Sequence, residues 1–196
     1  HKEYRRQRQM CIRDRSIVTI TSGPPTLANS DGTAMDVPVI VERNERGARV
    51  AYTAQAQDNT VEYKMCGFGT ACQIGGTPSI ARGDLLRREA LELALLTFKY
   101  DTSVKSVVTF FPKPAKTTDA PYALFFKRAD FEKELARPLA DTLGKQVVVL
   151  PTTLIPADTK RIGDLTSPRV FTFTYKQDQQ GFWILWLAMA LAVAWC

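Results

Sequence analysis

The stretch that decides the fold is Asp84–Tyr100, which reads DLLRREALELALLTFKY. Its apolar residues recur at the three- and four-residue spacing of an α-helix, and further leucines widen the apolar stripe. Charged residues fill most of the other positions. A stripe this broad indicates a helix that lies across a sheet rather than one surrounded by solvent. Asp84 is expected to be the N-cap of this helix.

Three runs before the helix alternate apolar and polar residues with the period of a half-buried β-strand. They span residues 37–43, 50–54 and 61–65, and turn-forming residues connect them at 44–47 and 57–59. Strands that follow one another through short turns pair as antiparallel neighbours. We therefore expect a three-stranded antiparallel meander ahead of the helix.

Later segments complete an α+β pattern. Strands are predicted at 104–111, 122–126, 147–150 and 170–175. A second main helix is predicted from Asp130 to about Leu143, with Pro138 as a kink and Gly144 as its stop, and a short helix is predicted near 158–165. Because strands and helices occur in blocks, we expect residues 16–176 to form one α+β domain with a mainly antiparallel sheet, packed by two main helices.

The first 15 residues differ in composition from the rest of the 196-residue chain. The run 5–15, RRQRQMCIRDR, resembles translated sequencing-adapter peptides, so residues 1–15 are expected to be a disordered, non-native leader. A natural basic arm is the alternative. The leader holds six of the 26 basic residues and two of the 20 acidic ones, which leaves 20 basic and 18 acidic residues for the domain. This near balance disfavours a nucleic-acid interface.

Residues 182–196 form an apolar tail without a charged side chain. The tail is shorter than the about 20 residues that a spanning helix needs, but the sequence stops inside it. We expect the start of a truncated transmembrane helix, with Trp183 and Trp186 at the membrane interface. The alternative is a strand at 182–187 that pairs with 170–175 and joins the core.

Several chemistries are excluded by what the predicted domain lacks. The only histidine of the chain is His1, inside the leader. The domain therefore lacks the histidine base that Ser-His-Asp and Cys-His catalysis need. It also lacks the histidine ligands of most catalytic zinc sites. The run Gly67-Phe68-Gly69 lacks the third glycine of a dinucleotide loop, and no P-loop lysine follows it. We expect no catalytic residue, cofactor or metal site.

Two cysteines and three arginines are candidate site residues. Cys66 and Cys72 are separated by five residues that include two glycines, which fits a small disulfide loop in an oxidising compartment or, alternatively, two buried thiols. Arg82, Arg87 and Arg88 lie near the start of the long helix. They are a weak candidate for an anion site, because arginines are also expected on any solvated helix face.

These observations favour a membrane-tethered, non-catalytic domain that faces the bacterial cell envelope outside the cytoplasm. Residues 182–196 would be its anchor, and a protein or an envelope ligand would be its partner. One alternative is a histidine-independent hydrolase of envelope glycans, which would need two facing carboxyl groups. The other is a soluble cytoplasmic subunit whose tail is a core strand, for which free thiols at Cys66 and Cys72 would be expected.

Overall fold

The computed structural model describes the parts of the chain on which the fold depends. These are residues 19–20, 39–44, 50–55, 59–65, 79–111, 121–144, 155–177, 179 and 181–189. The leader at 1–15, both candidate disulfide cysteines, Cys66 and Cys72, and the strand predicted at 147–150 lie outside these residues. The expectations about them therefore stay predictions.

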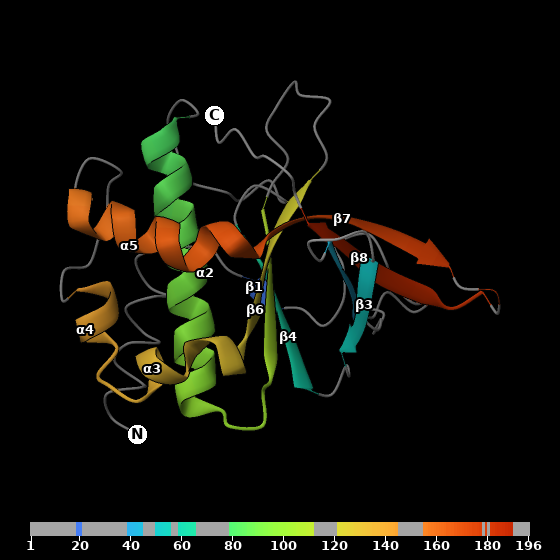
Figure 1. Cartoon of the computed structure of the whole chain (residues 1–196), viewed down its shortest axis with the longest axis horizontal. Helices are drawn as coiled ribbons and strands as arrows, with labels where there is room; N and C mark the ends of the chain where they lie inside the picture. The colour runs from blue at the N-terminus through green and yellow to red at the C-terminus, as the bar shows by residue number, and fades with distance from the viewer. Residues whose placement is uncertain are drawn as a thin grey trace.

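The described strands form one curled, mixed sheet, and helices cover one of its faces (Figure 1). The strand order is β1-β4-β5-β6-β7-β8-β2-β3. Among the described strands, β4–β5 and β2–β8 pair in parallel and the other five pairs are antiparallel. The α+β class is thus confirmed. The strands are β1 Thr19–Ile20, β2 Val39–Asn44, β3 Val50–Gln55, β4 Thr60–Lys64, β5 Ser106–Phe110, β6 Tyr122–Lys127, β7 Val170–Gln177 and β8 Trp183–Met189.

The predicted N-terminal meander is wrong for its third strand. β2 and β3 are antiparallel neighbours as expected, but β4 lies far from them in the sheet, between β1 and β5. The reason is burial. Tyr63 of β4 and Met65, which follows the strand, belong to the hydrophobic core under the long helix, whereas Val39 and Val41 of β2 belong to the core on the other face. The apolar face that each strand must bury, and not the short connection, decides its partner.

The long helix starts earlier than predicted. It is α2, Ile80–Tyr100, and its N-cap is Ser79, whose hydroxyl oxygen accepts a hydrogen bond from the backbone N–H of Arg82 at 3.3 Å. Asp84 is not the cap. It lies inside the helix, 3.7 Å from Arg87 in an ion pair. The other helices among the described residues are η2 Arg128–Phe131, α3 Glu132–Leu135, α4 Ala140–Leu143, α5 Pro156–Thr166 and η4 Ser167–Arg169.

The second predicted helix, at 130–143, is broken into short pieces. Pro138 lies between α3 and α4, where its missing N–H prevents a continuous helix. Asp130 does not cap a helix but forms an ion pair with Arg169 at 3.4 Å. Gly144 ends α4 with a φ of +72°, which confirms the predicted stop.

The apolar tail forms a strand where it is described. β8 pairs antiparallel with β7, from Phe171 opposite Met189 to Gln177 opposite Trp183, and in parallel with β2. The expectation of a helix beginning at Phe182 is therefore wrong over 183–189, and the alternative strand is confirmed there. None of the helices in the described part of the chain has both the length and the apolar composition needed to cross a bilayer. Residues 190–196 lie outside the described part.

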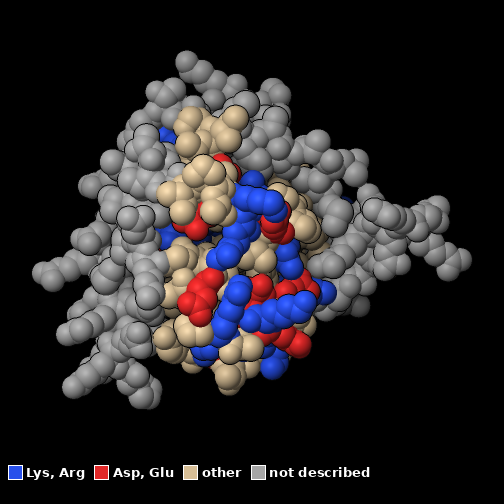
Figure 2. Space-filling model, turned by 60° about the vertical axis from the view of Figure 1, so that its left-hand side comes forward, with Lys and Arg blue, Asp and Glu red and all other residues tan. Residues whose placement is uncertain are grey.

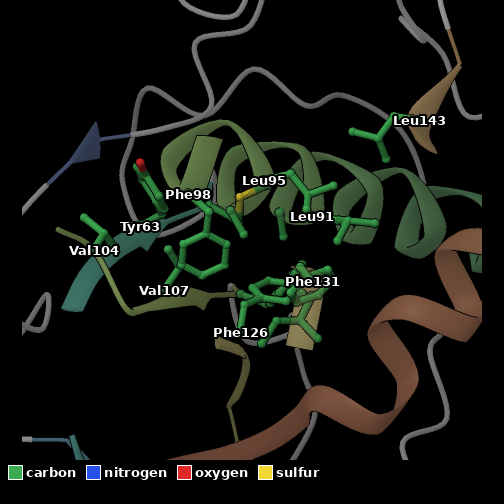
Figure 3. Close-up of a cluster of buried hydrophobic side chains, with 14 of the residues drawn as sticks. Tyr63, Leu91, Leu95, Phe98, Val104, Val107, Phe126, Phe131 and Leu143 are labelled. Atoms are coloured by element: carbon green, nitrogen blue, oxygen red, sulfur yellow. The ribbon is translucent and has the colours of Figure 1, made fainter. Parts of the chain in front are cut away.

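The sheet buries both of its faces. On the helix side, Figure 3 shows Phe98 of α2 close to Phe126 and Phe131, and the ring centroids of Phe126 and Phe131 are 5.7 Å apart. On the other face the curled sheet packs against itself. Val107 and Val108, which are successive residues of β5, belong to these two different cores, and both are fully buried. The second core consists of Val39, Val41, Val108, Phe110, Ala123, Phe125, Phe171, Leu185 and Leu187.

A pair of substitutions in the tail tests the role of β8. Leu185 is fully buried, whereas the side chain of Phe182 is 66% exposed. Leu185→Ala should lower the free energy of unfolding by about 2–5 kcal/mol, because it leaves a cavity in the second core. Phe182→Ala should change it by less than about 0.5 kcal/mol. Urea denaturation measures both, and equal effects would contradict the strand.

Candidate functional site

The first candidate residue, Arg87, is part of the internal framework of the helix layer. Its Nε donates to Thr166 Oγ1 at 2.7 Å and its Nη2 to Ser167 Oγ at 2.6 Å. Burial lowers the pKa of Arg87, and the charge of Asp84 offsets this in part. The guanidinium thus joins α2 to the end of α5 and to η4, and these contacts use its donors inside the protein.

Arg88 has a similar role one residue later. Its Nη2 donates to the main-chain oxygen of Leu143 at 3.0 Å, and its Nη1 lies 3.8 Å from Glu92 Oε2. Its side chain is buried, whereas Arg82 is half-exposed. Two of the three candidate arginines therefore join helices to one another. Their described contacts give the anion-site hypothesis no support.

The charges of the helix face are mixed in sign. Figure 2 shows Lys and Arg side chains interleaved with Asp and Glu on this side of the molecule. Some of them form short ion pairs, such as Lys160 with Asp164 at 2.7 Å. A nucleic-acid interface needs a continuous basic face that neutralises phosphates. The described part of this surface has no such face.

A polar corner, formed by Glu62, Lys64 and Tyr175, lies on the inner side of the curled sheet. Glu62 and Lys64 occupy the face of β4 that points away from α2, since the intervening Tyr63 packs in the core under α2. Tyr175 of β7 packs against the second core. Only 8% of Glu62 is exposed. Two strands separate β4 from β7 in the sheet, yet the charge of Glu62 influences Tyr175.

The groups of the polar corner influence one another electrostatically. Burial raises the pKa of Tyr175, and the negative charge of Glu62 raises it further. Burial lowers the pKa of Lys64, and Glu62 opposes this change. The hydroxyl of Tyr175 is shielded from solvent and has no hydrogen-bond partner among the described residues. Of these groups, Tyr175 packs against the apolar side chains of the second core.

The hydrolase alternative requires two carboxyl groups that face each other. In the described part of the chain, the almost fully buried carboxyl side chains are Glu62 and Glu89. Glu62 lies on the inner face of the curled sheet, whereas Glu89 belongs to α2, which covers the opposite face. The sheet separates them, so they do not form a facing pair. The described residues also contain no group of three acidic, cysteine or histidine side chains suited to a metal ion.

The sequence reasoning did not foresee that β3 lies at the end of the described strand order. A meander of β2, β3 and β4 would have placed β3 between two neighbours. With β4 elsewhere, β2 is the only described strand that pairs with β3. The signal that could have placed β4 correctly was the succession of a strand, a long helix and a strand in the sequence. Such a succession is typical of a parallel crossover unit, and β4, α2 and β5 form one.

Another exposed feature is the end of the β7–β8 hairpin, which extends away from the helix layer (Figure 1). Phe182 is largely exposed there, next to Gly181, whose φ is +85°. Trp186 is half-buried, and Lys176 Nζ lies 3.9 Å from the centroid of its ring. This surface offers one exposed aromatic side chain rather than a continuous apolar patch.

The structural role of Arg87 predicts a difference between two substitutions. Arg87→Lys should lower the free energy of unfolding by about 1–3 kcal/mol, because one ammonium cannot replace the forked contacts to Thr166 and Ser167. Lys160→Ala should change it by less than about 1 kcal/mol, since its ion pair is exposed. Chemical denaturation measures both. An Arg87→Lys variant as stable as the parent would show that the contacts of Arg87 with Thr166 and Ser167 are not needed for stability.

Tyr175→Phe should change how stability depends on alkaline pH. In the unfolded chain the phenol ionises near its ordinary pKa of 10.0, whereas its pKa is raised in the folded protein. The unfolded state therefore loses this proton first, and the free energy of unfolding falls as pH rises above about 10. The Tyr175→Phe variant has no phenol to ionise, so its free energy of unfolding does not fall for this reason. Its stability relative to the parent should be constant below about pH 9 and should increase above about pH 10, and a difference that stays constant to pH 11 would contradict the burial.

Comparison with known proteins finds no relative of this chain. No family model, no curated protein and no solved structure matches the chain.

Proposed function

We propose that the domain is a non-catalytic interaction module that binds a protein partner by adding a strand to the edge of β3. The observation that carries the proposal is the position of β3 at the end of the strand order. A strand with one neighbour has backbone N–H and C=O groups available on its other side. An extended segment of another chain can bind to such an edge through main-chain hydrogen bonds.

The regularity of β3 supports this proposal. Six successive residue pairs join it to β2, from Val39 opposite Gln55 to Asn44 opposite Val50, without a bulge. The strand, VAYTAQ, contains no charged residue, proline or glycine. Edge strands are commonly protected from pairing by charges, prolines or bulges. The absence of all three devices over six residues favours an edge that accepts a partner.

The other functional hypotheses have less support. The proposed membrane anchor at 182–196 would have to begin with residues that belong to β8. The two nearly buried carboxyl groups among the described residues, Glu62 and Glu89, lie on opposite sides of the sheet and give the hydrolase alternative no facing pair. An interaction module needs neither a membrane anchor nor a pair of catalytic carboxyl groups. It also agrees with the use of Arg87 and Arg88 inside the helix layer.

The proposal is tested by selecting binders from a displayed library of short random peptides. Hydrogen exchange of the protein, with and without the selected peptides, then locates the bound site. We expect the amides of residues 50–55 to gain protection. Gain of protection at the hairpin around Phe182, or at the polar corner, without any at β3 would contradict the proposal.

Two neighbouring proline variants provide the matched control. Successive N–H groups of a strand point to opposite edges, so one of Thr53→Pro and Ala54→Pro removes a donor to β2 and the other removes a donor at the free edge. Thermal unfolding identifies the second variant, because it keeps the stability of the parent. This stable variant should bind the selected peptides at least tenfold more weakly. Equal binding would contradict strand addition.

A further inference from the structure

We infer that residues 132–143 form a strap that opens as one unit while the sheet, α2 and α5 stay folded. The strap consists of α3, α4 and the turn around Pro138 between them, and it lies beside α2 (Figure 1). The inference goes beyond the proposed function, because it concerns the helix layer and not the edge of β3.

Two basic side chains of α2 attach the strap at its two ends. Lys99 Nζ donates to the main-chain oxygen of Leu135, the last residue of α3. Arg88 Nη2 donates to the main-chain oxygen of Leu143, the last residue of α4, at 3.0 Å. Carbonyl groups at the end of a helix have no acceptor role inside it, so these cations satisfy them from a neighbouring helix.

A third basic side chain attaches the strap to α5. Arg161 Nη1 donates to the main-chain oxygens of Asp141 at 2.7 Å and Thr142 at 2.9 Å. Among the described residues, no main-chain hydrogen bond joins the strap to α2, α5 or the sheet. The polar attachment of the strap therefore depends on side chains, whereas neighbouring strands of the sheet are joined by main-chain ladders.

Burial contributes little to the attachment. α3 has no buried residue, and in α4 only Thr142 and Leu143 are buried. Leu135 and Leu139 pack against the core under α2 but are half-buried. Helices of four residues are not stable on their own in water. Segments with few buried apolar contacts open at a lower free energy than the whole protein unfolds, which is the behaviour we expect of the strap.

Arg137 is the reason to expect that α3 and α4 open together. Its Nε donates to Thr142 Oγ1 at 3.1 Å, and its Nη2 lies 3.9 Å from Glu134 Oε1. The side chain thus joins the two short helices across the turn at Pro138. These contacts lie within the strap, so its opening does not break them.

Opening changes the surface of the helix layer. It removes Leu143 from the core under α2. It also removes the main-chain oxygen to which the buried guanidinium of Arg88 donates. The open state therefore presents apolar surface and a basic group of α2 that the closed state hides.

Native-state hydrogen exchange of the full chain in low concentrations of urea tests the strap. The amides of Ala136, Asp141, Thr142 and Leu143 donate main-chain hydrogen bonds inside the strap and so report its opening. Their exchange should be almost independent of urea, because local opening exposes little surface. The amides of residues 90–98 in α2 should exchange faster as urea increases. The same urea dependence in both groups, or strap amides that exchange as fast as in an unfolded peptide, would overturn the inference.

Arg161→Ala and Lys160→Ala form a matched pair of variants, since both residues are exposed on α5. Arg161→Ala should speed exchange at Ala136 and at residues 141–143 by the same factor, at least fivefold, because one opening exposes all of these amides. Lys160 pairs with Asp164 of its own helix, so Lys160→Ala should change these rates less than twofold. Faster exchange confined to 141–143, or equal effects of the two variants, would overturn the inference.

Discussion

The whole structure depends on one constraint, which is that the sheet has two apolar faces to bury. All five residues of β5 are buried, and its successive residues Val107 and Val108 belong to different cores. α2 covers one face with its broad apolar stripe. In the described part of the chain the other face is covered by the sheet itself, which curls so that β8 and β2 pack over β5 and β6. This burial explains why residues 183–189 of the apolar tail form a strand.

The curl also determines what the protein can offer to other molecules. On the inner side of the curled sheet, Glu62 and Tyr175 are polar groups with little or no contact with solvent, and the charge of Glu62 raises the pKa of Tyr175 beyond the effect of burial. The helix layer uses Arg87 and Arg88 to hold its own elements together. Among the described strands, β3 lies at the end of the curled sheet with β2 as its one neighbour. The proposed binding site is therefore a strand edge of the described sheet.

The sequence was sufficient for local features but not for partners distant in the chain. The 3.6-residue period of 84–100 predicted α2, and alternation predicted β2, β3 and β4 within a few residues. Alternation shows that a strand has a buried face but not which strand lies beside it, so the place of β4 was wrong. The apolar run at 182–189 fits a helix or a strand equally well. Arg87 and Arg88 looked like surface charges because their acceptors, at Thr166 and Leu143, are more than 50 residues away in the sequence.

The central claim is that the curl makes β8 an interior strand and leaves β3 at the edge. Native-state hydrogen exchange, resolved by residue, tests it most directly. The amides of residues 185–188, which lie between β7 and β2, should exchange only through global unfolding, like those of β5, whereas the amides of β3 should alternate between slow and fast exchange. Fast exchange throughout 185–188, or uniformly slow exchange throughout 50–55, would contradict the account.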